Sequence, residues 1–219
     1  MNIEISSELK NVAPELRLGV VDCTVRVTKR NDTLWERLQE RGSQLADELR
    51  NSELITVPEI AAARNAYRKL GKDPSRYRGS AEALLRRSIQ GKGLYQVNNI
   101  VDVNNLISIE SRHPVGVYDR ERISGAMLFR VGQPGEEYQG IGKQSINLEG
   151  LPVFVDDEGP FGSPTADSVK AMIREETKQV RLVVIAFWDD GRLERHLETA
   201  TRSLVEYADA ADVEVKVKA

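Results

Sequence analysis

The sequence predicts an α+β protein: a single compact domain in which flanking helices pack on a mixed or antiparallel sheet. Two observations indicate this fold class. Amphipathic helical patterns dominate before Pro114, whereas short apolar runs separated by glycine-bearing turns dominate after it. No internal repeat or long linker divides the 219 residues, which are enough to bury a real core. We therefore treat residues 1–219 as one domain.

The first half of the chain shows one strand and three helices. Residues 16–28 are β-branched and partly alternating, which is typical of a strand. Residues 31–49 begin with N-cap side chains and continue with leucines at helical spacing. A proline opens the alanine-rich helix predicted over residues 58–70, and a serine opens the helix predicted over residues 80–91. The glycine- and proline-bearing stretch at residues 72–79 is a predicted loop.

The second half is more ambiguous at its start. Residues 101–109 suit a helix or a strand, and the local pattern leaves both open. Short strands are predicted around residues 126–129 and 152–155, and the apolar run at residues 181–188 predicts a buried strand.

The chain closes with a helix and a strand. Leucines at helical spacing predict a helix over residues 193–205, and residues 213–217 alternate as a last strand does.

The amino-acid composition limits the classes of function and of binding site that the chain can have. With 31 basic and 34 acidic residues the net charge is −3, so contact with RNA requires a local basic patch. Cys23 is the only cysteine, which excludes an intramolecular disulfide and a cysteine-based zinc site. The first residues lack the pattern of a secretory signal, and no apolar run is long enough for a membrane helix. We therefore expect a cytoplasmic protein without a membrane partner.

Familiar catalytic motifs are absent from the sequence. It holds no phosphate-binding glycine loop, no dinucleotide fingerprint and no nucleophile elbow. His113 and His196 lie far apart without metal-ligand spacing, so we expect a structural or exposed His113 and a solvated His196. No cofactor and no metal are expected.

Two polar stretches are candidates for binding. The first is a basic cluster with two interleaved tyrosines: Arg64, Tyr67, Arg68, Lys69, Lys72, Arg76, Tyr77, Arg78, Arg86, Arg87 and Lys92. It suits an RNA-facing patch, because arginine and tyrosine stack on unpaired bases, but solvated helix faces paired with acidic residues explain it as well. The second is the asparagine-rich stretch 98–105, whose amides suit either ligand contacts or helix capping.

The second stretch begins a resemblance to a known family. Residues 101–110, Pro114 and Tyr118-Asp119 resemble the Val-Asp-Val/Ile-Thr-Asn-Tyr…Pro…His-Ala-Phe-Asp segment of the B3/B4 editing domain of the phenylalanyl-tRNA synthetase beta subunit. Further matches follow in order: Ile123, Gly125, Phe129-Arg130, Gly135-Glu136 and residues 153–156. Upstream, residues 78–87 resemble free-standing members of this family. The resemblance covers about residues 60–185, a B3/B4-like core that a strand–helix before it and a helix–strand after it complete.

The resemblance implies a site as well as a fold. The family's domain hydrolyses tyrosine mistakenly esterified to phenylalanine tRNA, and its pocket bonds the extra hydroxyl. Asn104 falls where the family has threonine and Asn105 matches its asparagine, so both are implied to bind substrate. The family's histidine falls on Gly116, and Asp167 stands in for its later glutamate as the implied catalytic residue. We expect Asn104, Asn105 and Asp167 to share one cavity.

Three hypotheses follow. The first is an aminoacyl-tRNA deacylase that acts in trans, with Arg64, Arg86 and Arg87 binding RNA. The second is a non-catalytic module that binds a free amino acid or RNA, favoured by Gly116 in the histidine's place. The third is a scaffold that kept only the fold. No adenylation machinery is recognisable, so aminoacylation by this chain is not expected; the sequence specifies neither the amino acid, the tRNA nor the oligomeric state.

Overall fold

The computed structural model describes residues 2–50, 53–142 and 145–219. Its helices are α1 Ser7–Val12, α2 Asp32–Leu49, α3 Pro58–Lys69, α4 Ser80–Ile89, α5 Asn99–Ser111 and α6 Leu193–Ala208, with the short 3₁₀ helices η1 Leu54–Thr56 and η2 Arg120–Arg122. Its strands are β1 Ile3–Ile5, β2 Arg17–Thr24, β3 Val115–Asp119, β4 Met127–Val131, β5 Glu137–Gln139, β6 Ser145–Asn147, β7 Pro152–Asp156, β8 Gly159–Gly162, β9 Gln179–Ala186 and β10 Ala211–Lys218. Within the described parts of the chain, none of the helices has the length and apolarity needed to cross a bilayer.

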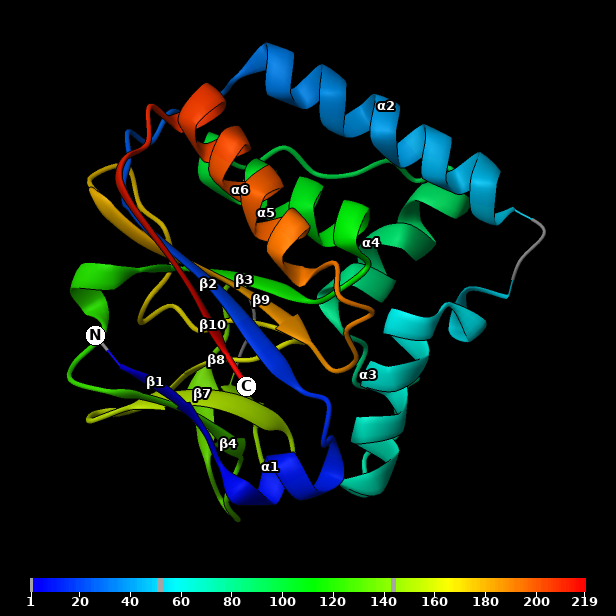
Figure 1. Ribbon diagram of the computed structural model, residues 1–219, viewed down its shortest axis with the longest axis vertical. Helices are drawn as coiled ribbons and strands as arrows, with labels where there is room; N and C mark the ends of the chain where they lie inside the picture. The colour runs from blue at the N-terminus through cyan, green and yellow to red at the C-terminus, as the bar shows by residue number, and fades with distance from the viewer. Residues whose placement is uncertain (1, 51–52, 143–144) are drawn as a thin grey trace.

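An antiparallel sheet of order β10-β2-β9-β3 forms the middle layer. Helices α2, α4, α5 and α6 lie on one side of it (Figure 1). Alternate residues of each strand face these helices: Val21 of β2 and Val117 of β3 join Val103 and Leu106 of α5 in the first core cluster. The helical side of the sheet is therefore solid core.

A second sheet of order β1-β4-β7-β8 covers the other face. Strand β1 runs parallel to β4, and the remaining pairs are antiparallel, so this sheet is mixed. Val20 of β2 and Tyr118 of β3 meet Phe129 and Phe154 in a second core cluster between the two sheets. The prediction of an α+β fold with mixed and antiparallel strands and flanking helices is confirmed.

Residues 101–109, which the local pattern left open, belong to helix α5. The side chain of Asn98 caps this helix by accepting a hydrogen bond from the backbone N–H of Val101 at 2.9 Å. Arg112 ends the helix with a left-handed φ of 62°. Because α5 is buried on most sides, its sequence carries little helical periodicity, which explains the ambiguity.

Each end of the chain contributes a strand to one of the two sheets. The predicted last strand is β10, which lies beside β2. Strand β1 and helix α1 were not anticipated, because three residues and six residues are too few to show a period. The limits of the predicted core at residues 60–185 stay a prediction.

A fully buried ion pair connects two neighbouring strands inside the second core. Arg181 of β9 lies opposite Asp22 of β2 and donates to both carboxylate oxygens, at 2.7 and 2.6 Å. The two side chains are 1% and 2% exposed. Their mutual bonding offsets the desolvation of two charges, and removing one partner would leave the other charge unpaired.

Candidate functional site

The predicted catalytic carboxyl is bound to the side chain of Tyr118 on β3. Asp167 lies in the loop after β8, and its Oδ1 accepts hydrogen bonds from the Tyr118 hydroxyl at 3.0 Å and from the Ser163 N–H at 3.2 Å. Among the residues that the structure describes, Oδ2 of Asp167 receives no hydrogen bond. One carboxylate oxygen is thus fixed by the protein, while the other is open to a further partner.

Two glycines make room for the ring of Tyr118. A Cβ atom built on Gly116 would lie 2.2 Å from the Tyr118 hydroxyl oxygen, and one built on Gly162 would lie 2.5 Å from it. Neither position therefore accepts a side chain while Tyr118 holds this orientation. The resemblance predicts the family's histidine at Gly116, and in this structure the phenol of Tyr118 occupies the space that a side chain at that position would enter.

More hydroxyl groups surround the carboxyl. The Tyr67 hydroxyl lies 2.8 Å from Oγ1 of Thr165, and the Tyr138 hydroxyl donates to the carbonyl of Ala166. The Ser163 hydroxyl donates to the same carbonyl at 2.7 Å. These bonds fix Ser163, Thr165 and Ala166 of the loop, so that Asp167 is positioned by a bonded framework rather than by a free loop.

Burial sets the protonation chemistry of this cluster. Desolvation raises the pKa of Asp167 to about 6, although the hydrogen bonds from Ser163 and Tyr118 oppose the shift. Burial also raises the pKa of Tyr118 well above its usual value, so this phenol stays neutral and acts as a donor. A carboxyl with a pKa near 6 is mostly ionised at neutral pH and can accept a proton from water.

A narrow cavity lies beside this cluster. Tyr67, Gly79 and Pro114 line it, and the N–H of Ser80 donates to the carbonyl of Pro164 at 2.8 Å next to it. The volume open to the centre of a water molecule is about 10 Å³, which is room for about one water. As it stands, the cavity holds a water but not an amino-acid side chain.

The predicted substrate-binding asparagines lie elsewhere. Helix α5, which carries Asn104 and Asn105, packs on the helical face of the sheet, whereas the ring of Tyr118 that binds Asp167 lies on the other face. No hydrogen bond joins Asp167 to either asparagine in the described parts of the chain. The structure therefore gives no support to one cavity shared by all three. Asn104 is buried with an unpaired Oδ1, while Asn105 is half-buried.

The three predicted RNA-binding arginines have different surroundings. Arg64 is buried and donates to Glu82 at 2.9 Å, so this guanidinium is used inside the fold. Arg86 also reaches Glu82, at 2.8 Å, from the helix surface. Arg87 lies 3.9 Å from the ring centroid of Tyr95, whose side chain is 61% exposed. Only the Arg87–Tyr95 pair presents a stacked cation and ring to solvent among these contacts.

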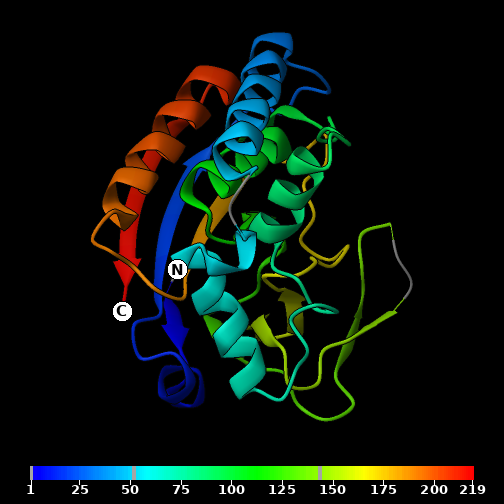
Figure 2. The same cartoon turned by 90° about the vertical axis from the view of Figure 1, so that its right-hand side faces the viewer.

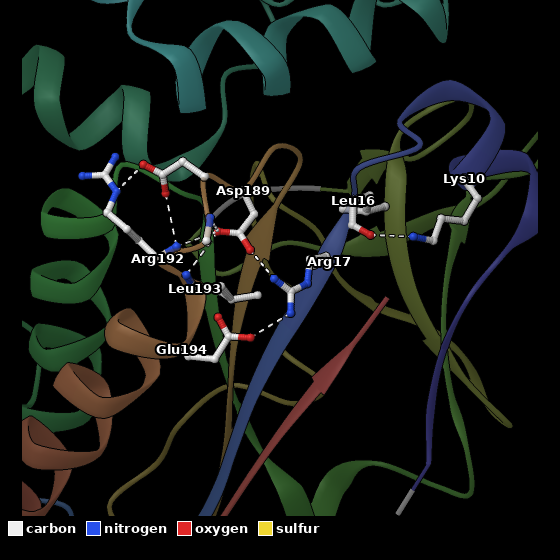
Figure 3. Close-up of polar contacts among 9 residues, drawn as sticks. Lys10, Leu16, Arg17, Asp189, Arg192, Leu193 and Glu194 are labelled. Carbon is white, nitrogen blue, oxygen red and sulfur yellow. Dashed lines mark hydrogen bonds and ion pairs between the residues drawn. The ribbon is translucent and has the colours of Figure 1, made fainter.

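A second polar cluster lies at the start of α6 (Figure 3). Arg17 of β2 lies between Asp189 and Glu194 and bonds to both, at 2.8 Å to Glu194. Oδ1 of Asp189 accepts from the backbone N–H groups of Gly191, Arg192 and Leu193, each at 3.1 Å. Asp189 therefore caps the helix, and its bonding is satisfied without a ligand.

The two histidines, which lie far apart in the sequence, meet near this cluster. The ring centroids of His113 and His196 lie 5.9 Å apart in an edge-to-face arrangement. The prediction that His196 is a solvated residue was wrong, because its ring is half-buried against His113. Burial lowers the pKa of His113 to about 4, and its Nδ1 has no hydrogen-bond partner among the described residues. No group of three or more potential metal ligands exists in the described ranges.

Sequence reasoning missed Tyr118 as a site residue. A signal was present in the predicted alignment, which sets Gly116 against the family's histidine and Tyr118 against its phenylalanine. The exchange removes an imidazole and adds a hydroxyl on the same face of one strand.

Comparisons with known proteins agree on one family. The model of the B3/4 domain family matches residues 62–214. The phenylalanine–tRNA ligase beta subunit of Mycolicibacterium paratuberculosis is 26% identical over 172 residues, which is 76% of this chain and 20% of that protein. The beta subunit of Protochlamydia amoebophila is 34% identical over 85 residues, 38% of this chain and 11% of that protein. The chain thus spans a fifth or less of these relatives.

A solved structure is similar at low identity. It is an N-terminal fragment of the phenylalanyl-tRNA synthetase beta subunit from Pyrococcus horikoshii, 15% identical, with a TM-score of 0.47. The similarity covers 99% of this chain and 50% of that one.

Proposed function

The chain belongs to the B3/4 domain family, and we propose that it hydrolyses an aminoacyl-tRNA ester in trans, with Asp167 as the general base. The half-buried carboxyl of Asp167, with its pKa raised to about 6 and one oxygen unbonded by the described residues, is the observation that carries this proposal. The relatives named as beta subunits of phenylalanine–tRNA ligase suggest the class of substrate.

The chemistry needs two proton transfers. In the proposed reaction Oδ2 of Asp167 takes a proton from a water molecule as the water oxygen attacks the acyl carbon. The ester C–O bond then breaks, and the ribose oxygen of the tRNA leaves with the proton that Asp167 returns. A general base contributes about 10²–10⁴-fold to such a rate. The amino acid and a free tRNA 3′ end are the products.

Tyr118 acts as a positioning residue in this proposal. Its hydroxyl holds Oδ1 of Asp167 and directs Oδ2 to the water. It also occupies the place of the family's histidine, so the chain would work with a single carboxylate base.

The partner in this proposal is an aminoacyl-tRNA, bound by partly exposed arginines of α4 and by the segment after it. Arg87 and Tyr95 offer a cation and a ring that can stack on an unpaired base. Arg86 can reach a phosphate while Arg64 and Arg78 remain near Glu82.

The test is deacylation of a panel of mischarged tRNAs by the full chain and by Asp167→Asn. The proposal expects hydrolysis of at least one ester above the spontaneous rate, and a loss of about 10²-fold or more in the variant. Asp32→Asn, an exposed carboxyl in the first turn of α2, is the matched control and should keep full activity. Spontaneous rates with every tRNA, or an unchanged rate in Asp167→Asn, would reject the proposal.

A second function is favoured by Asn104. Its buried Oδ1 is an unpaired acceptor away from Asp167, and an amino acid's ammonium group can satisfy such an oxygen. In this alternative Asn104 and Asn105 bind a free amino acid without turnover. A thermal-shift screen distinguishes the two: stabilisation by an amino acid that Asn104→Ala and Asn105→Ala abolish, together with spontaneous ester hydrolysis, indicates binding alone.

A further inference from the structure

Strand β10 has an unpaired edge. It is the terminal strand of the order β10-β2-β9-β3, and β2 is its hydrogen-bonded neighbour. In Figure 2 it lies at the outer margin of the molecule, below α6. Two of its valines are unusually exposed for apolar residues in a strand, Val215 by 49% and Val217 by 37%. A long exposed edge with apolar residues is a template for another strand.

A groove runs along this edge. It lies between β10 and α6, has a volume of about 570 Å³, and is lined on the helix by Leu197, Glu198 and Thr201 and on the strand by Val215 and Val217. Oγ1 of Thr201 is buried and has no hydrogen-bond partner among the described residues. The groove thus combines apolar walls with charged margins, which is the composition of an interface.

The sequence of β10 is complementary to itself when it is read in the opposite direction. In an antiparallel pair of two copies with the two-fold axis at Val215, Glu214 faces Lys216 of the second copy. The regular part of the strand begins at Glu214, because β10 has a bulge between Ala211 and Glu214 and Asp212 has a φ of 52°. The pair at the axis then joins two valines and the pairs beside it join opposite charges, and such pairs stabilise a sheet.

Other registers lose this match. With the axis at Lys216, two lysines face each other. With the axis at Glu214, two glutamates face each other. An axis between Val215 and Lys216 sets charged residues opposite valines. The charges therefore select one arrangement of two copies.

We propose that the chain forms a symmetric dimer in which β10 pairs antiparallel with β10 of a second copy about a two-fold axis at Val215. The two four-stranded sheets become one continuous sheet, and the groove of each copy is covered by the other. Strand β3, which carries Tyr118, is the opposite edge of the sheet, so both Asp167 sites stay open. This dimer is independent of the proposed hydrolysis.

The first test uses charge exchange on the full chain. Glu214→Lys and Lys216→Glu each put like charges across both symmetric pairs, and the double variant restores opposite charges with their positions exchanged. Sedimentation equilibrium should show a dimer for the wild type. Each single variant should raise the dissociation constant about tenfold or more, and the double variant should recover the wild-type value. Glu36→Lys, exposed on α2, is the matched control and should remain a dimer.

The second test determines which residues lie opposite each other in the dimer. Val215→Cys places two thiols directly opposite each other at the axis, so mild oxidation should give a covalent dimer, while Val217→Cys should not. The native Cys23 is buried and does not compete. Circular dichroism serves as the check that each variant is folded. A wild type that stays monomeric at all concentrations, a folded double variant that stays monomeric, or equal cross-linking at both cysteines would overturn the proposal.

Discussion

The hydroxyl of Tyr118 donates a hydrogen bond to Oδ1 of Asp167 at 3.0 Å, across 49 residues of sequence. The bond connects the edge strand β3 to the loop after β8. It also ties together two groups of the proposed site: the carboxyl proposed as the general base, and the phenol that fills the space beside Gly116. The predictions below begin with this pair.

Replacing Tyr118 with phenylalanine should move the pH dependence of ester hydrolysis. The hydrogen bond from Tyr118 lowers the pKa of Asp167, so its loss should raise that pKa further above about 6. The base is active when ionised, and the rate should therefore rise with pH at a higher midpoint in Tyr118→Phe than in the wild type. Rate–pH profiles measure this; Tyr67→Phe, which loses its bond to Thr165 instead, should leave the midpoint in place.

Removing one member of the Asp22–Arg181 pair should be severely destabilising. Asp22→Ala leaves a buried guanidinium without its carboxylate, which costs about 3–5 kcal/mol in the free energy of unfolding. The double variant Asp22→Leu/Arg181→Met should recover most of that loss, because no buried charge remains. Urea unfolding gives both values. Glu175→Ala, which breaks an exposed pair with Lys29, should cost less than about 1 kcal/mol.

Acid should destabilise the fold partly through His113. Its folded pKa of about 4 lies below the ordinary 6.5, so the unfolded chain takes up the proton first as the pH falls. The stability from the neutral imidazole is complete above about pH 6.5 and is lost toward pH 4, by about 3 kcal/mol at most. Asp102 and Asp167, with pKa values raised to about 6, act in the opposite direction.

The contribution of His113 appears as a difference between two proteins. In His113→Leu the carboxyls titrate as before, so the unfolding free energy of the wild type minus that of the variant should fall between pH 6.5 and 4. Urea titrations across this range measure the difference. A flat difference would mean that the imidazole is not held neutral.

Arginine substitutions should separate RNA binding from folding. Arg87→Ala or Tyr95→Ala should weaken binding of single-stranded RNA by about 1–3 kcal/mol, because each removes half of an exposed stack. Arg64→Ala should instead lower the unfolding free energy by about 1–3 kcal/mol, since it removes a buried partner of Glu82. Filter binding and urea unfolding report the two effects, and Arg122→Ala, exposed on η2, should change neither.

Several parts of this protein follow from local sequence. The strand β2 and the helices α2 to α4 could be predicted because alternation, helical spacing and caps such as Asn31 act within a few residues. Family membership could be inferred from ordered motifs, and the α+β class from the change of pattern after Pro114. These features need only neighbours along the chain.

Tertiary structure decided which distant residues meet. Asp167 bonds to Tyr118, His113 lies against His196, and Arg64 turns inward to Glu82. Asp22 and Arg181 are 159 residues apart and pair only because β2 and β9 share one register. Each of these contacts depends on strand order and on the face to which a side chain points. A local pattern shows that a residue lies in a strand or helix, but the packing of the sheets decides what faces it.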